Sequence, residues 1–306
     1  PAGSIYVYKG EWGKSGSGNG EFASPRGVAA APSGRIYVSE VGNFRVQYFT
    51  ATGRYLGKWG RRGVGNGEFY GPCDVAVAPG GNVYVVDDGN NRIQYFKPTG
   101  SFLGKWGEYG TGDGRFHRPR GIAIGRNGRV YVSDNGNHRV QYFTPTGSFL
   151  GKWGSHGTGD GEFREPTDVT KAPNGNVYVL EYVRCRVQYF TSNGRFLGKW
   201  GSRGQEDGQF DRPEGIAVSP RSGVVFVVDT DNNRVQYFTP TGSFLGKWGT
   251  MGSRPGQLYY PTNITFGPKN HYVYVADMLN CRIQYFKETE PAVAPTSLGR
   301  VKALFK

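Results

Sequence analysis

Six carboxylate–arginine pairs are the residues of this sequence whose types and spacing first suggest chemistry. In each pair an arginine follows an acid by five residues: Glu40 and Arg45, Asp87 and Arg92, Asp134 and Arg139, Glu181 and Arg186, Asp229 and Arg234, and Asp277 and Arg282. Six acids around a ring would supply oxygen ligands for an ion. Each pair also spans one predicted hairpin turn, where the acid and the arginine can bond to each other and to turn backbone. We therefore expect the pairs to be structural.

A second set of polar residues follows a proline that recurs once per unit. The two residues after each proline read Arg26-Gly27, Cys73-Asp74, Arg120-Gly121, Thr167-Asp168, Glu214-Gly215 and Thr262-Asn263. Because glycine alternates with Asp or Asn, a six-membered ring would place Asp74, Asp168 and Asn263 about 120° apart at the mouth of its central channel. Their oxygens could hold a hard cation such as Ca²⁺, or a polar ligand group. In the other interpretation these side chains only cap the start of the inner strand.

Departures from the repeat mark further candidate binding residues. They are Lys171, which replaces an apolar residue, Tyr182 and Arg184 in a turn that is elsewhere polar, and Phe44, Met278 and Leu279 in the corresponding turns of other units. Apolar side chains exposed on one face and rimmed by charge are typical of a protein or peptide site. Arg26, Arg120 and Glu214, at the predicted channel mouth, complete the candidate set. Drift in a redundant repeat is the alternative explanation.

Catalytic constellations are not visible. The four histidines, His117, His138, His156 and His271, occupy different positions of the repeat. His138 shares its turn position with Phe44, Asn91, Cys185, Asn233 and Cys281, which predicts a turn residue and not a metal ligand. The three cysteines cannot all pair, and the two that share that turn position lie beyond disulfide reach of each other. We therefore predict a protein that is not an enzyme and has no cofactor other than the Ca²⁺ considered above.

The elements that must position these residues repeat with a nearly constant period. The six tryptophans, Trp12, Trp59, Trp106, Trp153, Trp200 and Trp248, are spaced by 47 residues and once by 48. In the unit that opens at Pro119, the pieces 121–124, 129–133, 139–143 and 149–153 read as four short strands joined by glycine-containing turns. Four short antiparallel strands per unit of about 45 residues are typical of propeller blades. The sequence predicts an all-β fold, a six-bladed β-propeller of four-stranded antiparallel blades.

The two ends of the repeat array predict how the ring closes. The sixth unit stops after Arg282–Phe286 and lacks its own outer strand, whereas Tyr6–Trp12 precedes Pro25, the proline that opens the first unit, and belongs to no complete unit. We expect the N-terminal strand to pair into the last blade, which removes the exposed strand edges of an open array. The propeller would then comprise residues 1–287, and residues 288–306 would form a linker and a short C-terminal tail.

The repeated pieces resemble NHL repeats. The resemblance rests on Val-Tyr-Val-x-Asp followed by Asn-x-Arg-Val/Ile-Gln-Tyr-Phe, as in Val83–Phe96, and on Gly-x-Gly-Asp-Gly-x-Phe before the proline. It covers about residues 5–287 and implies the fold; a shared fold does not carry a shared activity. Tripartite-motif NHL proteins bind RNA on a basic propeller face, and a related lyase that amidates peptides holds zinc with histidines around the central cavity. A matching histidine set is not visible in this sequence.

These observations lead to one function and two alternatives. We expect a non-enzymatic binding scaffold for a protein, peptide or glycan on the face that bears the hairpin turns and interblade loops. A net charge of +13 keeps open the binding of RNA or another polyanion, and a metal-dependent lyase or hydrolase is the second alternative. The apolar runs are too short for membrane insertion. We also expect a monomeric propeller, and the tail, of a kind found in extracellular bacterial NHL proteins, favours secretion.

Overall fold

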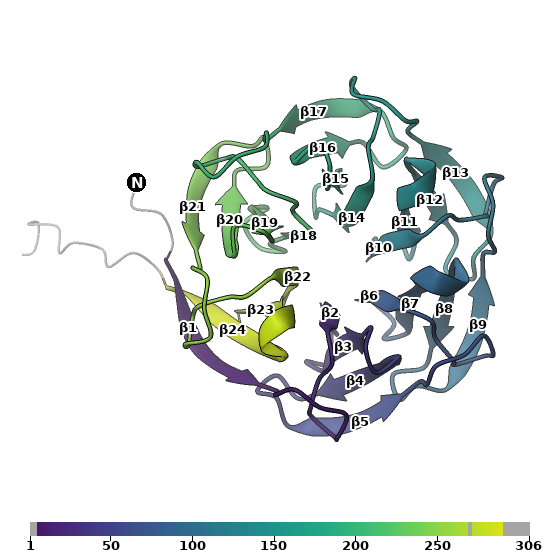
Figure 1. The fold of residues 1–306 in the computed structure, drawn as a ribbon. Helices are drawn as coiled ribbons and strands as arrows, with labels where there is room; N and C mark the ends of the chain where they lie inside the picture. Colours follow the sequence, from purple (N-terminus) through teal and green to yellow (C-terminus); the bar gives the residue numbers. More distant parts are fainter. Residues whose placement is uncertain (1–4, 269–270, 290–306) are drawn as a thin grey trace, which may run out of the picture.

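The computed structural model describes residues 5–268 and 271–289, which form a ring of six four-stranded antiparallel sheets (Figure 1). Blade 1 contains β2 (Pro25–Ala30), β3 (Ile36–Glu40), β4 (Arg45–Phe49) and β5 (Tyr55–Trp59). Blade 2 contains β6 (Pro72–Val77), β7 (Val83–Asp87), β8 (Arg92–Phe96) and β9 (Phe102–Trp106). Blade 3 contains β10 (Pro119–Ile124), β11 (Val130–Asp134), β12 (Arg139–Phe143) and β13 (Phe149–Trp153).

The second half of the ring follows the same plan. Blade 4 contains β14 (Pro166–Lys171), β15 (Val177–Glu181), β16 (Arg186–Phe190) and β17 (Phe196–Trp200). Blade 5 contains β18 (Gly215–Val218), β19 (Val225–Asp229), β20 (Arg234–Phe238) and β21 (Phe244–Trp248). Blade 6 contains β22 (Pro261–Phe266), β23 (Tyr272–Asp277), β24 (Arg282–Thr289) and β1 (Ile5–Trp12). The all-β, six-bladed prediction is confirmed.

The N-terminal strand closes the ring as expected. β1 pairs antiparallel with β24, so the outer strand of blade 6 comes from the opposite end of the chain. The Tyr6 ring stacks on Trp248 of blade 5 with the centroids 4.8 Å apart, and Trp12 packs against Phe49 of blade 1 at 5.7 Å. Of the predicted tail, residues 288–306, only the first two positions belong to the described residues. They form the end of β24, which continues to Thr289.

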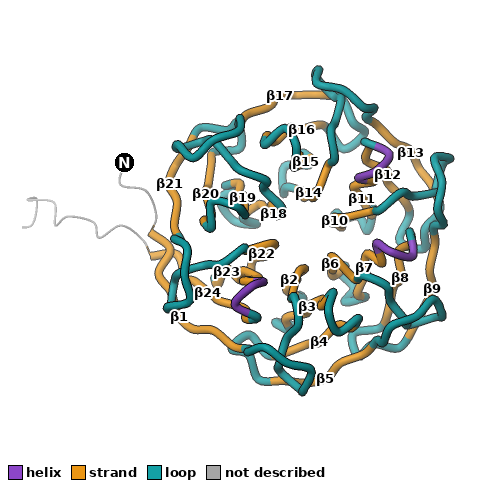
Figure 2. The backbone as a smooth tube through the Cα atoms, in the orientation of Figure 1, coloured by secondary structure: helices purple, strands orange, loops and turns teal. Residues whose placement is uncertain are grey.

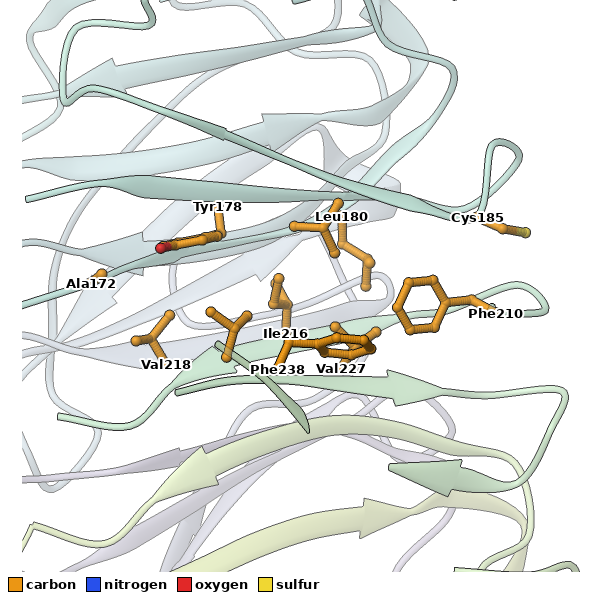
Figure 3. Close-up of a cluster of buried hydrophobic side chains, with 11 residues drawn as sticks. Ala172, Tyr178, Leu180, Cys185, Phe210, Ile216, Val218, Val227 and Phe238 are labelled. Carbon is orange, nitrogen blue, oxygen red and sulfur yellow. The ribbon is translucent and has the colours of Figure 1, made fainter. Parts of the chain in front are cut away.

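The hydrophobic core lies between the blades. The middle strands, such as β11, are buried along their whole length, because each blade is covered on both sides by a neighbour. Outer strands such as β13 alternate between covered and exposed residues. Figure 3 shows the contact between blades 4 and 5, where Tyr178 and Leu180 face Phe210, Ile216 and their neighbours. Sheet-on-sheet packing of this kind fixes each blade relative to the next and so fixes the loops at its ends.

The strand directions give the propeller two faces that carry different turns and loops. Every inner strand begins at the face that carries the interblade loops and the turns between the second and third strands of each blade, which we call the loop face. It ends at the face that carries the other two turns of the blade, which we call the opposite face. Figure 2 shows the interblade connections, in teal, running from the outer rim towards the centre of the ring. Among the described residues, no helix is long and apolar enough to cross a membrane.

The six acid–arginine pairs hold the interblade loops in place. In blade 3, Arg139 Nε donates to Asp134 Oδ2 at 2.7 Å, and its guanidinium also donates to the carbonyl oxygens of Thr111, Gly112 and Arg115 at 2.7–2.8 Å. The same acid–arginine bond is present in each of the other five blades. The acids are fully buried. The structural interpretation is confirmed, with one difference: the arginines bond to the backbone of the preceding interblade loop and not to that of the hairpin turn.

Candidate functional site

The three polar residues at the channel mouth connect adjacent blades. Asp74 Oδ2 accepts a hydrogen bond from the backbone N–H of Ile122 in blade 3 at 2.9 Å. Asp168 Oδ2 does the same for Ile216 in blade 5 at 2.8 Å, and Asn263 Oδ1 for the N–H of Val28 in blade 1 at 3.4 Å. These side chains line both the central channel, a cavity of about 250 Å³, and a smaller cavity at the loop face. Each even blade thus holds the inner strand of the next odd blade.

The alternation of glycine with Asp or Asn follows from this packing. A Cβ atom on Gly27 would lie 2.7 Å from the Cα of Asp74, and one on Gly121 would lie 2.6 Å from the Cα of Asp168. Real Cβ atoms do not approach other atoms so closely, so a larger residue would push the inner strands apart. Gly215 has the same relation to Asn263. The odd blades therefore carry glycine because the even-blade residue occupies the space.

Burial changes the acidity of the two aspartates. Removal from water raises the pKa of Asp74 to about 7, even though two backbone N–H groups stabilise its charged form. The pKa of Asp168 is also raised, first by burial and then by the nearby charge of Asp74. A carboxyl whose pKa is higher in the folded state takes up a proton on folding, so its contribution favours the native state below pH 4 and is lost as pH rises through about 7.

The Asp74→Asn, Asp168→Asn double variant tests this linkage, because Asn263 already occupies the third equivalent position. Loss of the charge penalty is expected to raise the melting temperature at about pH 8.5 by about 3–5 °C, with little change at about pH 5. The comparison must be made between proteins at the same pH, since burial lowers the pKa of His138 and gives a pH dependence of opposite sign. An equal shift at both pH values would show that the carboxyls are ionised throughout.

The oxygens proposed for Ca²⁺ binding are the ones that accept these backbone hydrogen bonds. Asp74 Oδ1 accepts from Val75 N at 2.8 Å, and Asp168 Oδ1 accepts from Val169 N at 2.7 Å. Within residues 5–268 and 271–289, no three His, Cys, Asp or Glu side chains are grouped so that they could hold a metal ion. The geometry supports the capping interpretation, and Ca²⁺ binding at this position stays a prediction.

Charged residues from blades 1, 2, 3 and 5 meet above these caps. Arg26 Nη2 lies 2.8 Å from Glu214 Oε2, an ion pair between residues 188 positions apart in the sequence. Arg120 faces Asp88 more loosely, with Nε 4.0 Å from Oδ2. Arg120 Nε and Asp88 Oδ1 are enclosed and make no hydrogen bond within the described part of the chain. The structure thus places the predicted Arg26, Arg120 and Glu214 together and adds Asp88, which sequence comparison did not single out.

Tyr182 belongs to a polar aromatic cluster between blades 4, 5 and 6. Its hydroxyl is hydrogen-bonded to that of Tyr260, and the guanidinium of Arg212 lies 6.0 Å from the centroid of its ring. Arg212 also pairs with Asp231 at 3.3 Å. Burial raises the pKa of Tyr260 to about 12, so both phenols are neutral at physiological pH. Tyr260 and Arg212 stand before the opening prolines of their units with positive φ values of 54° and 45°, where such side chains are unusual.

A second aromatic cluster lies between blades 1 and 2. The Phe44 ring stacks on Tyr70 with the planes 9° apart and the centroids separated by 6.2 Å. The guanidinium of Arg62 lies 5.5 Å from the Phe44 centroid and 5.3 Å from the Tyr70 centroid. Tyr70 is 46% exposed. Phe44 was a predicted site residue, whereas Tyr70 and Arg62 were not, because they come from the following interblade loop.

The other predicted residues of the loop face are less closely grouped. Leu279 is 47% exposed and Met278 is half-buried in the turn of blade 6, where they belong to η3 (Met278–Asn280). Arg184 replaces the turn asparagine of the other blades, and its Nε is enclosed without a hydrogen-bond partner among the described residues. These three side chains extend the candidate surface around the mouth without joining either aromatic cluster.

The prediction that Lys171 belongs to the binding surface of the loop face is wrong. It is the last residue of the inner strand β14, and therefore lies at the opposite face, where its Nζ donates to the carbonyl oxygen of Gly175. Asp168, near the start of the same strand, lies at the loop face. A strand of six residues spans about 17 Å, so its two ends cannot belong to the same mouth.

Most cations of the loop face have an acidic partner. The pairs include Arg61 with Glu68 at 2.7 Å, Arg118 with Asp88 at 3.9 Å and Arg203 with Asp211 at 3.3 Å. At the rim, Lys152, Lys199 and Lys247 pair with aspartates of the preceding interblade loops. The loop face is therefore less basic than the residue counts alone suggested.

The histidines of blades 3 and 4 lie closer together than their repeat positions indicated. The rings of His138 and His156 are 4.7 Å apart, and His138 Nδ1 accepts a hydrogen bond from Glu165 N at 3.2 Å. Asn91 and Asn233, at the same turn position as His138, make the same contact with Arg118 and Tyr260 of the next loops. His138 thus acts as a turn residue that contacts the next blade.

Comparisons with known proteins agree with this architecture. The family model described as NHL repeat matches residues 22–49, 69–96, 116–143 and 210–238, which lie in blades 1, 2, 3 and 5. No curated protein sequence matches the chain. The four matches share the strand that ends in the buried acid and the strand that begins with its arginine.

Solved structures with the same fold have very different sequences. The streptogramin B lyase structure is 17% identical with a TM-score of 0.65 and covers 93% of this chain and 98% of its own. A gluconolactonase from Xanthomonas campestris is 15% identical (TM-score 0.65; 94% and 99%). An auxiliary nutrient binding protein from Bacteroides ovatus is 15% identical (TM-score 0.68; 94% and 78%). At these identities the likeness shows the fold alone. With its four matched repeats and six closed blades, the chain is an NHL-repeat six-bladed β-propeller.

Proposed function

We propose that this protein is a non-enzymatic binding scaffold that recognises a protein or peptide on the loop face of the propeller. The observation that carries the proposal is the pair of aromatic–arginine clusters on this face, one formed by Phe44, Tyr70 and Arg62 and the other by Tyr182, Tyr260 and Arg212. Tyrosine and arginine are the residue types that most often dominate the energy of protein interfaces.

Charged residues between the two aromatic clusters would help to orient a ligand on the proposed surface. The Arg26–Glu214 ion pair lies at its centre, together with Arg120 and Asp88, which face each other at 4.0 Å without a hydrogen bond between them. Aromatic rings flanked by charge also suit a glycan, which is the other ligand class of this proposal. The scaffold that holds these groups is rigid, because the buried pairs fix each interblade loop.

A pull-down from the native source with two surface variants tests the proposal. The first double variant combines Arg62→Ala with Tyr70→Ala, and the second combines Tyr182→Ala with Tyr260→Ala. We expect each double variant to weaken ligand capture about tenfold or more, since truncation of hot-spot residues commonly costs at least ~2 kcal/mol. Leu103→Ala is the matched control, because Leu103 is 38% exposed on the outer rim, away from the loop face. Melting temperatures of all variants show that each is folded. Equal capture by all four proteins would refute this surface.

RNA or another polyanion is the alternative ligand. It predicts salt-sensitive binding that weakens when Arg26, Arg118 and Arg120 are changed to Ala. The acidic partners of these arginines speak against it. Zinc or iron that co-purifies with the protein would instead favour a metal-dependent lyase or hydrolase, and elemental analysis of the purified protein checks this second alternative.

A further inference from the structure

A separate cavity on the opposite face lies between blades 3 and 4. Its volume is about 530 Å³, and its lining includes Arg126, Arg129, Tyr131, Lys171 and Asn193. We call it the blade 3–4 pocket. It is continuous with the central channel, because Ile124, Lys171, Val218 and Pro220 line both cavities. Lys171 therefore stands where the pocket meets the channel.

Two of the three cations in this pocket are departures from the repeat. The position of Arg126 is proline in all five of the remaining units: Pro32, Pro79, Pro173, Pro220 and Pro268. The position of Lys171 is apolar in all five of the remaining units: Ala30, Val77, Ile124, Val218 and Phe266. The third cation, Arg129, recurs only as Arg35 in blade 1, where the facing residue of the next blade is Val77. The fold itself therefore does not require the three cations that meet here.

The cations of this pocket have neutral partners. Arg129 Nη1 donates to Asn193 Oδ1 at 2.9 Å, and its guanidinium lies 4.9 Å from the centroid of the Tyr142 ring. Lys171 donates to the Gly175 carbonyl and lies 5.7 Å from the centroid of the Tyr131 ring. The residues that line the pocket include no Asp or Glu. Burial, and then the charge of Arg129, lower the pKa of Lys171. The arrangement concentrates positive charge that no acid of the described chain balances.

We propose that the blade 3–4 pocket binds a small anionic molecule through carboxylate or phosphate groups, with Lys171 and Arg129 as its direct contacts and Arg126 at the rim. The cavity has the size of small-molecule sites in proteins, and such sites combine apolar walls with a few convergent polar groups. Arginine and lysine are the side chains that recognise these anions, and a partly enclosed position strengthens the attraction. This site is independent of the ligand proposed for the loop face.

Titration calorimetry with citrate and with pyrophosphate, at an ionic strength of about 0.15 M, tests the proposal. The wild-type protein is expected to bind at least one of the two anions. Lys171→Val and Arg129→Gln should each weaken that binding about tenfold or more. Arg35→Gln should leave it unchanged, because Arg35 has the same repeat position and lies over a tyrosine ring, Tyr48, in the same way. Preference for citrate or pyrophosphate tells a carboxylate ligand from a phosphate ligand.

Lys171→Val introduces the residue that Val77 and Val218 provide elsewhere, so this variant is expected to fold, and its melting temperature verifies this. Absence of binding by the folded wild-type protein, or an equal loss in the Arg35 and Arg129 variants, would overturn the proposal, because the effect would then be general electrostatics. Tighter binding of an RNA oligonucleotide than of either small anion, with the same dependence on Lys171, would also overturn it.

Discussion

Deletion of residues 1–12 is expected to leave a chain that is largely unfolded or aggregated at physiological temperature. The deletion removes β1, and with it three aromatic side chains that pack on neighbouring strands: Tyr6 on Trp248, Tyr8 on Phe286, and Trp12 on Phe49. These three side chains are partly buried, so each contributes somewhat less than the about 3–5 kcal/mol of a fully buried aromatic residue. The sum is comparable to the whole stability of about 5–15 kcal/mol of a typical native protein.

The open edge of β24 adds a second penalty. Without β1, the backbone N–H and C=O groups of β24 that face β1 lose their partners and form an exposed strand edge, which promotes aggregation, although β24 remains paired with β23. Circular dichroism during a thermal melt measures the effect, and a deletion of residues 1–4, which lies outside β1, is the matched control. A deletion variant that melts at the wild-type temperature would show that ring closure contributes little to stability.

Removal of one buried cation is the second change with a large expected effect. Arg139→Met should lower the free energy of unfolding by about 3–5 kcal/mol, because it leaves the buried carboxylate of Asp134 without its charged partner. It also removes the donors to three loop carbonyls. Urea-induced unfolding measures the loss, and the same change in another blade should give a similar value because the network repeats.

The matched control lies in the same blade. Lys152→Met removes the cation of an exposed ion pair with Asp113, in which the side chains are 45% and 52% exposed. Water screens such pairs, so the expected cost is below about 1 kcal/mol. If the two variants lose the same stability, the buried network does not hold the loops. A double variant, Arg139→Met with Asp134→Leu, should recover part of the loss, because it removes the stranded charge.

The stability networks and the candidate sites use different residues of the same repeat. The acids, arginines and inner caps recur in every blade or in every second blade, and they set the position of each loop. The aromatic clusters and the blade 3–4 pocket depend on residues that differ between blades. Variation at these positions costs little stability because the scaffold does not depend on them, which is how one fold carries different functions.

The sequence by itself determined the scaffold. The tryptophan spacing gave the number of blades, the alternation within each unit gave the strands, and the incomplete sixth unit gave the closure by Tyr6–Trp12. These features follow from local periodicity, since every blade makes the same kind of contact with its two neighbours. The five-residue spacing of Asp134 and Arg139 likewise predicted a bond across one hairpin, because both residues belong to paired strands.

Only the tertiary structure decided which blade-specific side chains meet. Arg26 and Glu214 form an ion pair across the channel mouth although 188 residues separate them. Tyr70 joins Phe44 only because an interblade loop folds over the preceding turn. Lys171 lies at the opposite face from Asp168, a separation that the strand length alone could have indicated. The repeat period fixes where each backbone position lies in its own blade, whereas contacts between unlike side chains depend on the curvature of the ring and on which rotamers fill the space between blades.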